Sequence, residues 1–386
     1  MKQQINITPT RLLILSFSIF SFVSFSFSQS QEVPMQSEDW AIENRDARFE
    51  VHEGYPSMYF NDSGADATGN SIIQAKGSSF YNGTIEFDLA IDEGARFVSF
   101  YFRQQDENNS EHVYLRAFFA GNHRSSGGFQ YAAVIDGVNY WDLSFPYQTG
   151  VTMLGEGKWN HIKLIVRDRQ MLAYVNDMER PALYIPILDG IDRPGGIGVD
   201  GKGWIANLQI NPDQVDGLSA GMGYDPLHND IRYLRTWQVT NPIDFPFGRE
   251  PVEADLPGSE TQWSGIQAEH HGLINLSRPF GQTPRGERRL VWLKATIKAG
   301  EPVDRTLDLG ISDEVYVYLN GSPLYVGRNP YNTPAMLEPS GRASIENTQI
   351  DLPLKKGENE LLIGVANYFF GWGIVARLND GSGLDY

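Results

Sequence analysis

The chain has no cysteine among its 386 residues. This absence excludes disulfide bonds, thiol catalysis and cysteine-ligated metal sites. The folded state must therefore rest on hydrophobic cores, and a chain of this length can bury two of ordinary domain size.

Basic residues are also scarce, with 31 Lys and Arg against 48 Asp and Glu and a formal net charge of −17. A chain this acidic repels nucleic-acid phosphates and anionic lipid, so we expect no nucleic-acid partner. It also repels anionic polysaccharides unless a local basic patch exists, which makes neutral glycans the easier partners.

Long apolar runs are missing except near the start, where Leu12 to Phe27 follows the basic residues Lys2 and Arg11. Ser26 and Ser28 offer small side chains at positions that a signal peptidase recognises. The run is shorter than the roughly 20 residues that span a bilayer. We therefore predict a signal peptide over 1–28, export to a secreted, periplasmic or cell-surface location, and no membrane-spanning segment after its removal.

Motifs of metal and serine catalysis are absent too. The seven histidines form no HExxH pattern, and no GxSxG sequence occurs. The sequence therefore predicts no catalytic metal site, no identifiable cofactor and no serine nucleophile. Acidic turns leave a structural Ca²⁺ ion as an open alternative.

The chain does contain many short segments in which apolar and polar residues alternate. The sharpest is a predicted hairpin over 162–175, with further strands expected over 84–89, 97–103, 112–119 and 130–135. Period-two alternation between Gly, Asn and Asp turns is typical of antiparallel sheets. The first two thirds of the chain is therefore predicted to form a β-sandwich over 32–212.

A second set of strands follows a segment, 213–262, that is rich in Pro, Gly and Asp and predicted to be a linker leading into the next domain. Residues 313–326 form the clearest hairpin, because Asn320-Gly321 is a strong type I′ turn signal. Together these patterns predict an all-β protein with two jelly-roll sandwiches in tandem, the second over 263–386.

Two resemblances support this division. The sequence GEGKWNHIKLIVRDRQMLAYVND at 155–177, with the Gly-led segments 195–199 and 203–210, resembles the concanavalin A-like lectin/glucanase group, especially its laminin-G-like and 3-keto-disaccharide-hydrolase-type members. The 313–326 hairpin and the segment 354–365 resemble a galactose-binding-like jelly roll. The resemblances imply sugar binding or glycoside processing, and modules of both kinds often hold a structural Ca²⁺.

Glu86 and Asp88 leave the same face of one predicted strand. The glucanases of this fold carry a third acid two or three residues further on, where this chain has Ala90 and Ile91. Glycoside hydrolysis needs its paired carboxyl groups. We therefore transfer no catalytic role to Glu86 and Asp88, and the catalytic residues, if any, are not predicted.

Alternation also turns tyrosines and arginines of the next strands away from the core. If those strands pair with the strand of Glu86, one face would carry both groups, and its alternative is a salt-bridged solvent face. Tyr rings stack on sugars and Arg binds hydroxyl or carboxylate groups. We predict an exported carbohydrate-binding protein, with a glycoside hydrolase-type enzyme and a structural module of a surface assembly as alternatives. The predicted ligand-binding residues are Glu86, Asp88, Tyr101, Arg103, Tyr114 and Arg116.

Overall fold

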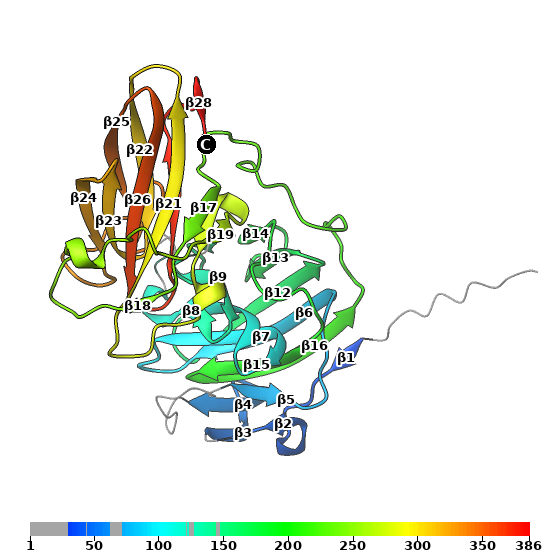
Figure 1. The fold of residues 1–386 in the computed structure, drawn as a ribbon. Coiled ribbons are helices and arrows are strands. Elements are labelled where there is room, and N and C mark those ends of the chain that lie inside the picture. The colour runs from blue at the N-terminus through cyan, green and yellow to red at the C-terminus, as the bar shows by residue number, and fades with distance from the viewer. Residues whose placement is uncertain (1–29, 44, 62–71, 121, 123–126, 144–146) are drawn as a thin grey trace, which may run out of the picture.

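A computed structural model describes residues 30–43, 45–61, 72–120, 122, 127–143 and 147–386, and Figure 1 shows their fold. The predicted signal peptide over 1–28 lies outside the described residues. Within the described part the regular structure is almost entirely β, with a single α-helix, α1 (Ser277–Phe280), and none of the helices is long and apolar enough to cross a membrane. The short 3-10 helices are η1 (Ser37–Asp39), η2 (Ala117–Phe119), η3 (Glu253–Asp255) and η4 (His270–Gly272).

The first sandwich consists of two eight-stranded antiparallel sheets. One sheet runs in the order β14 (Leu183–Ile185), β13 (Gln170–Val175), β12 (Trp159–Arg167), β6 (Gly83–Ile91), β16 (Gly203–Pro212), β4 (Tyr55–Asn61) and β3 (Asp46–His52), with β1 (Gln31–Glu32) on β16. The other runs β10 (Val138–Asn139), β9 (Phe129–Ile135), β8 (Asn109–Arg116), β7 (Phe97–Asp106), β15 (Gly196–Gly201), β5 (Ile73–Ala75) and β2 (Trp40–Ala41), with β11 (Gln148–Thr149) on β9.

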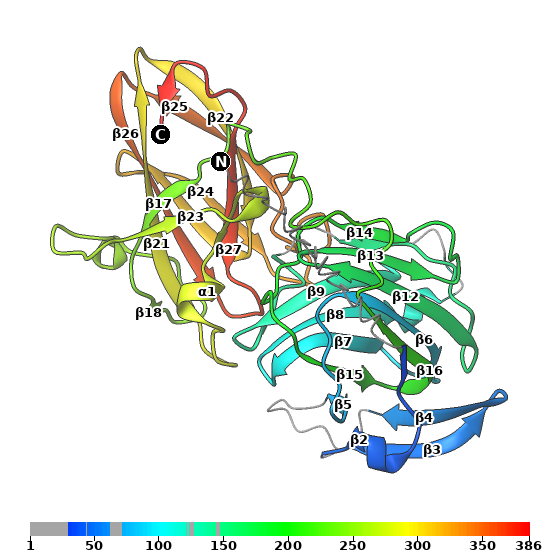
Figure 2. The same ribbon diagram turned by 90° about the vertical axis from the view of Figure 1, so that its right-hand side faces the viewer.

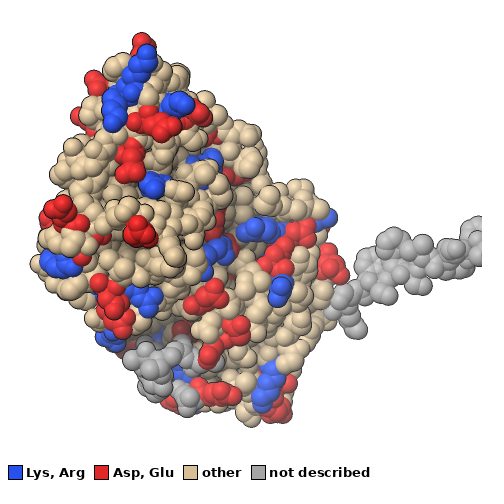
Figure 3. Space-filling view, viewed as in Figure 1, with Lys and Arg blue, Asp and Glu red and all other residues tan. Residues whose placement is uncertain are grey.

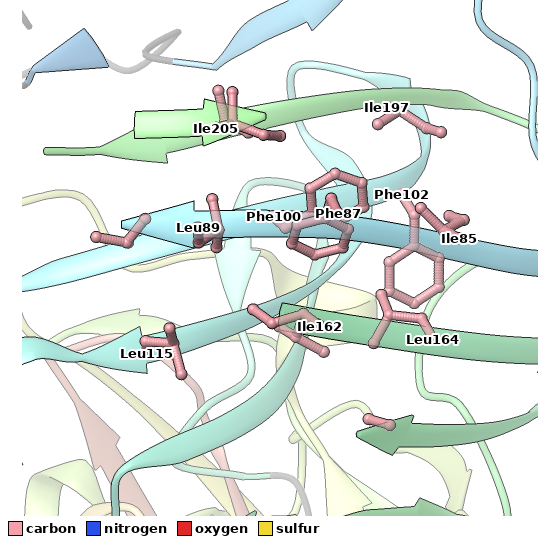
Figure 4. Close-up of a cluster of buried hydrophobic side chains, with 14 of the residues drawn as sticks. Ile85, Phe87, Leu89, Phe100, Phe102, Leu115, Ile162, Leu164, Ile197 and Ile205 are labelled. Atoms are coloured by element: carbon pink, nitrogen blue, oxygen red, sulfur yellow. The ribbon is translucent and has the colours of Figure 1, made fainter. Parts of the chain in front are cut away.

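The core of this sandwich lies between the two sheets, as the alternation predicted. Phe87 of β6 stacks on Phe100 of β7 across the layers, with ring centroids 3.9 Å apart. Figure 4 shows aliphatic side chains from both sheets around this pair. Because every second residue of β6, β7 and β12 enters this core, the residues between them must leave from the two outer faces.

The second sandwich packs an eight-stranded sheet on a four-stranded one. The larger runs β19 (Ser264–Gln267), β17 (Thr236–Val239), β21 (Arg289–Ala299), β26 (Gly357–Asn367), β23 (Asp313–Leu319) and β24 (Ser322–Asn329), with β18 (Ile243–Asp244) and β28 (Leu384–Asp385) on β21. The smaller runs β20 (Leu273–Asn275), β27 (Gly373–Leu378), β22 (Val303–Ile311) and β25 (Thr348–Leu354).

The predicted hairpins form. Strands β12 and β13 pair in antiparallel register, and so do β23 and β24. Asn320 and Gly321 have φ values of 51° and 80°, both positive as a type I′ turn requires. The all-β fold class with two sandwiches is therefore confirmed. The boundary predicted over 213–262 stays a prediction, and β17 and β18 of the second sandwich come from that segment.

The two sandwiches are in contact along one side of the β7–β8–β9 sheet (Figure 2). The contact is apolar at its centre, where Leu143 of the first sandwich packs with Tyr233, Leu273, Ala343 and Val375 of the second. A backbone hydrogen bond from Ala343 N to Asp142 O, 2.9 Å long, fastens it. The segment after β10 thus anchors the second sandwich beside one outer face of the first.

Candidate functional site: a cavity between the two sandwiches

A cavity of about 550 Å³ lies where the second sandwich meets the outer face of β7 and β8. Its floor is a row of three aromatic rings. Tyr101 stacks on His112 with centroids 4.9 Å apart, and His112 on Tyr114 at 5.4 Å, both pairs within 19° of parallel. Strand pairing produces this row, since Tyr101 faces His112 across the ladder and Tyr114 lies two residues along β8.

The walls come from loops far apart in the sequence. Trp141 follows β10, and its ring lies 4.8 Å from that of Tyr331, in the loop after β24, and 5.8 Å from that of Phe370, between β26 and β27. Phe369 stacks on Tyr331 at 6.2 Å. Aromatic walls above an aromatic floor give the cavity apolar surfaces on several sides.

Buried carboxyl groups hold the Phe369–Phe370 loop in place. Asp313 accepts hydrogen bonds from the backbone N–H groups of Tyr368, at 2.7 Å, and Phe369, at 3.0 Å. Asp142 of the first sandwich accepts one from Gly371 N at 3.1 Å. Phe370 has a φ of 48°, which is unusual for a bulky side chain and is maintained by these bonds on both sides.

The charged groups that line the described part of the cavity are mainly cationic. Arg116 donates from Nη1 to Gly127 O at 3.1 Å and to Gln148 Oε1 at 3.3 Å, and its guanidinium lies 5.4 Å from the Tyr114 ring centroid. Arg96 also lines the cavity and is exposed. Arg45 forms an ion pair with Asp200. A mostly apolar cavity with a few convergent polar groups is the usual form of a small-molecule site.

Burial sets the charge state of the floor. It lowers the pKa of His112 to about 3, so the imidazole is neutral at physiological pH. Burial also raises the pKa of Tyr101 and of Tyr114, so both remain phenols. The His112 Nδ1 atom is buried with no hydrogen-bond partner among the described residues. The floor is therefore an uncharged stacking surface with cations at its edge.

The structure places the six predicted ligand-binding residues on different surfaces of the first sandwich. Tyr101, Tyr114 and Arg116 line the cavity. Glu86 and Asp88 do not, because β6 pairs with β12 and β16 in the opposite sheet rather than with β7. The prediction that all six residues share one face is wrong, since alternation gives the side of a strand and not the sheet to which the strand belongs.

On that opposite face Glu86 and Asp88 belong to a polar network. The His161 ring approaches Asp88 Oδ1 with Nδ1 at 2.8 Å and Glu86 Oε2 with Nε2 at 3.4 Å. Asn207 Nδ2 donates to Asp88 Oδ2 at 2.6 Å. The hydrogen bond to Asp88 raises the pKa of His161 against a smaller opposing effect of burial. This arrangement is the salt-bridged solvent face that was the alternative.

Arg103 departs from the predicted face in another way. Its φ is 48° and the β7–β8 register shifts after Phe102, so the strand no longer alternates there. The side chain is 1% exposed and donates to Tyr81 O at 2.9 Å and to Asp168 O at 2.6 Å. Arg103 therefore fastens the end of the sandwich rather than facing a ligand.

The two tyrosines that turn away from the core are nevertheless buried. Tyr101 is 9% and Tyr114 7% exposed, although both leave the outer face as predicted. The loops of the second sandwich cover that face and make it the floor of the cavity. Covered rings with a cavity beside them remain accessible to a ligand that enters the cavity.

The described part of the cavity holds neither a pair of carboxyl groups nor a cluster of metal ligands. Asp200 is the one carboxylate in the described lining, and Arg45 neutralises it. A glycosidase of the usual kind needs two carboxyl groups. Nowhere among the described residues do three His, Cys, Asp or Glu side chains gather to hold a metal ion. The suggestion of a structural Ca²⁺ stays a prediction without a located site.

Several cavity residues were missed from the sequence. His112 could have been found, because it alternates in register with Tyr114 and Arg116 on β8. Trp141, Tyr331, Phe369 and Phe370 lie in loops of different sheets. The aromatic run before Gly371 was the only local signal, and it does not indicate which surface the loop will cover.

No protein-family model matches this chain, and no curated protein matches it. Solved structures similar to parts of it include a carbohydrate-binding module, CBM66, from Bacillus subtilis, at 19% identity and TM-score 0.33 over 45% of this chain and 95% of that one. Chicken galectin 2 matches at 11% identity and TM-score 0.27 over 34% of this chain and 96% of its own. A family 35 carbohydrate-binding module from an environmental isolate matches at 18% identity and TM-score 0.21 over 31% and 84%. Such likeness concerns fold alone and gives no residue of this chain a role.

Proposed function

We propose that this chain is an exported carbohydrate-binding protein whose ligand site is the cavity between the two sandwiches. The observation that carries the proposal is the row of near-parallel rings formed by Tyr101, His112 and Tyr114 under a cavity of about 550 Å³. Sugar rings have apolar C–H faces that pack on aromatic rings and hydroxyl groups that hydrogen-bond to polar side chains. The cavity offers both kinds of contact.

The size of the cavity supports the same proposal. Small-molecule sites typically enclose about 300–1,000 Å³, so one or two sugar units fit here. The wall rings Trp141 and Tyr331 can contact a second face of the ligand. Because the walls come from both sandwiches, we propose that the whole chain, rather than either sandwich alone, forms the site.

Tyr331 provides the best test, since the residue is 43% exposed and loss of its ring should leave both cores intact. In a titration with an oligosaccharide found by glycan-array screening, Tyr331→Ala should weaken binding at least tenfold, about 1.4 kcal/mol. Tyr101 and Tyr114 are poorer probes, because truncating buried rings also changes packing.

Tyr184→Ala is the matched control, since Tyr184 is 48% exposed on β14 of the other sheet. Its binding should equal that of the unaltered protein. Equal losses in both variants, or none at Tyr331, would rule the cavity out. Release of reducing sugar from a bound glycan would favour the enzymatic alternative.

A further inference from the structure

The charges around the cavity do not balance. Its described lining contains three guanidinium groups, those of Arg45, Arg96 and Arg116, and a single carboxylate, that of Asp200. Asp200 pairs with Arg45, and no carboxylate of the described residues forms an ion pair with Arg96 or Arg116. The cavity is therefore positive within a chain whose net charge is −17. Figure 3 shows, for one face of the molecule, acidic and basic side chains interspersed rather than segregated.

A fourth guanidinium strengthens the local positive charge. Arg342 of the second sandwich is 1% exposed, donates to the Trp141 carbonyl and reaches Gln148 Oε1 from Nη2 at 3.1 Å. Arg116 donates to the same amide oxygen at 3.3 Å. Burial and the nearby Arg116 charge lower the pKa of Arg342 to about 10, so it is still a cation at neutral pH.

Two cations that share one neutral acceptor repel each other, and partial burial weakens the screening of that repulsion by water. An anion placed beside Arg116 offsets this repulsion. Since the Arg116 guanidinium lies beside the Tyr114 ring, a sugar stacked on the floor would bring its ring substituents to that cation. Guanidinium groups bind carboxylate and sulfate oxygens with two parallel hydrogen bonds.

We infer that the cavity selects an acidic saccharide, one whose sugar carries a carboxylate or a sulfate ester, with Arg116 as the group that binds the anion. This inference rests on the proposed glycan-binding function and refines it. The acidic composition of the chain disfavoured anionic glycans unless a local basic patch existed, and the cavity supplies that patch. At physiological salt the Debye length is about 8 Å, so the distant surface acids are screened from a ligand inside.

The test compares ligands that differ only in charge. The full-length protein is titrated calorimetrically with trigalacturonate and with its methyl ester, and separately with a sulfated galactan oligosaccharide and its desulfated form. In at least one of the two pairs, the charged ligand should bind at least ten times more tightly than its neutral counterpart. The pair that shows this difference tells whether the cavity recognises a carboxylate or a sulfate ester. Raising the salt concentration should weaken that binding.

Arg116→Gln should lower the affinity for the charged ligand at least tenfold and that for its neutral counterpart less than twofold. Arg96→Gln, which removes an exposed cation of the same cavity, should have a smaller effect in the same direction and serves if Arg116→Gln does not fold. Arg193→Gln is the control, because Arg193 is an exposed arginine of the first sandwich outside the cavity lining.

Equal affinity for charged and neutral members, combined with a loss in Tyr331→Ala, would overturn the acidic specificity and leave the proposed function standing. An equal loss for both members in Arg116→Gln would also overturn it, since Arg116 would then be a general polar contact. Failure to bind any of the four ligands, together with no hit in the array screen, would overturn both proposals.

Discussion

The two outer faces of the first sandwich arise from the same alternation and differ in what lies over them. On the face of β7 and β8, Tyr101 and Tyr114 are 9% and 7% exposed. On the face of β6 and β12, the side chains of Glu86 and His161 are 36% and 39% exposed. The second sandwich covers the first of these faces and not the second, where Glu86 and His161 are partly exposed.

One histidine on each face shows how burial under the second sandwich changes a side chain's pKa. His112 lies under the second sandwich, and burial lowers its pKa to about 3. His161 lies on the open face, and its hydrogen bond with Asp88 raises its pKa. The same side chain is thus a neutral stacking ring on one face, and on the other it lies beside two carboxylates that favour its protonated form. On the covered face Arg96 and Arg116 form no ion pair with a described carboxylate, whereas on the open face His161 lies against both Asp88 and Glu86.

The largest effect is expected from a substitution that disturbs the contact between the second sandwich and the face of β7 and β8. Gly371 packs so closely on Asp142 and Leu143 that an added Cβ would overlap both side chains. Gly371→Ala should therefore lower the free energy of unfolding by about 3 kcal/mol, because a methyl group forced into a packed contact displaces its neighbours. Urea unfolding measures the loss.

Gly265→Ala is the matched control in the same sandwich, since nothing lies within 4 Å of its added Cβ. Its stability should change by less than about 0.5 kcal/mol. Similar changes in the two variants would mean that the contact between the sandwiches is not tightly packed.

The covered face should also respond to pH. Asp142 is 3% exposed, and burial raises the pKa of its carboxyl group from 3.8 to about 7. The folded state therefore holds a proton that the unfolded state loses, so this contribution to stability is complete below about pH 4 and is lost as the pH rises through about 7. Glu111, whose pKa burial raises to about 8, acts in the same direction.

Asp142→Asn retains an oxygen that accepts from Gly371 N and removes the titration. Relative to the unaltered protein it should gain roughly 2 kcal/mol of stability at pH 9 and little at pH 4. Thermal unfolding across this pH range provides the measurement. A parallel pH dependence in the two proteins would show that Asp142 does not titrate in this window.

The strands of both sandwiches could be predicted because the alternation of apolar and polar residues that marks a strand lies within that strand's own sequence. Phe87, Phe100, Phe102 and Leu115 are all buried in the core, as period two required. Turn chemistry was equally local, since Asn320 and Gly321 determine their hairpin without help from the rest of the chain.

Only part of the candidate site could be predicted. The rest depends on contacts between segments that are far apart in the sequence. Alternation identified Tyr101, Tyr114 and Arg116 as outward, and could not say that β6 joins the other sheet or that a loop near Phe370 would cover them. The side of the strand predicted for Arg103 was wrong because the β7–β8 register shifts after Phe102, and no feature of the sequence indicates that shift. Sheet membership and contact between sandwiches depend on pairings distant in sequence, which one sequence does not reveal.

The smallest effect is expected on the open face. At about 39% exposure the His161 pair with Asp88 is screened by water, so its contribution to stability should be below about 1 kcal/mol. Because Asp88 raises the pKa of His161 above 6.5, this contribution is complete below pH 6.5 and is lost as the pH rises through the raised value.

Asp88→Asn should accordingly bring the His161 pKa down, as measured by NMR titration of the imidazole protons, and should lower stability slightly at pH 5.5 and not at pH 9. Glu86→Gln should cause a smaller pKa change, because Glu86 Oε2 lies 3.4 Å from His161 Nε2, whereas Asp88 Oδ1 lies 2.8 Å from His161 Nδ1.

Both variants should bind the saccharide ligand with unaltered affinity, because their side chains lie on the face opposite the cavity. A tenfold loss of binding in Asp88→Asn would instead place a ligand on the open face, and the contrast between the two faces would then fail as a guide to function.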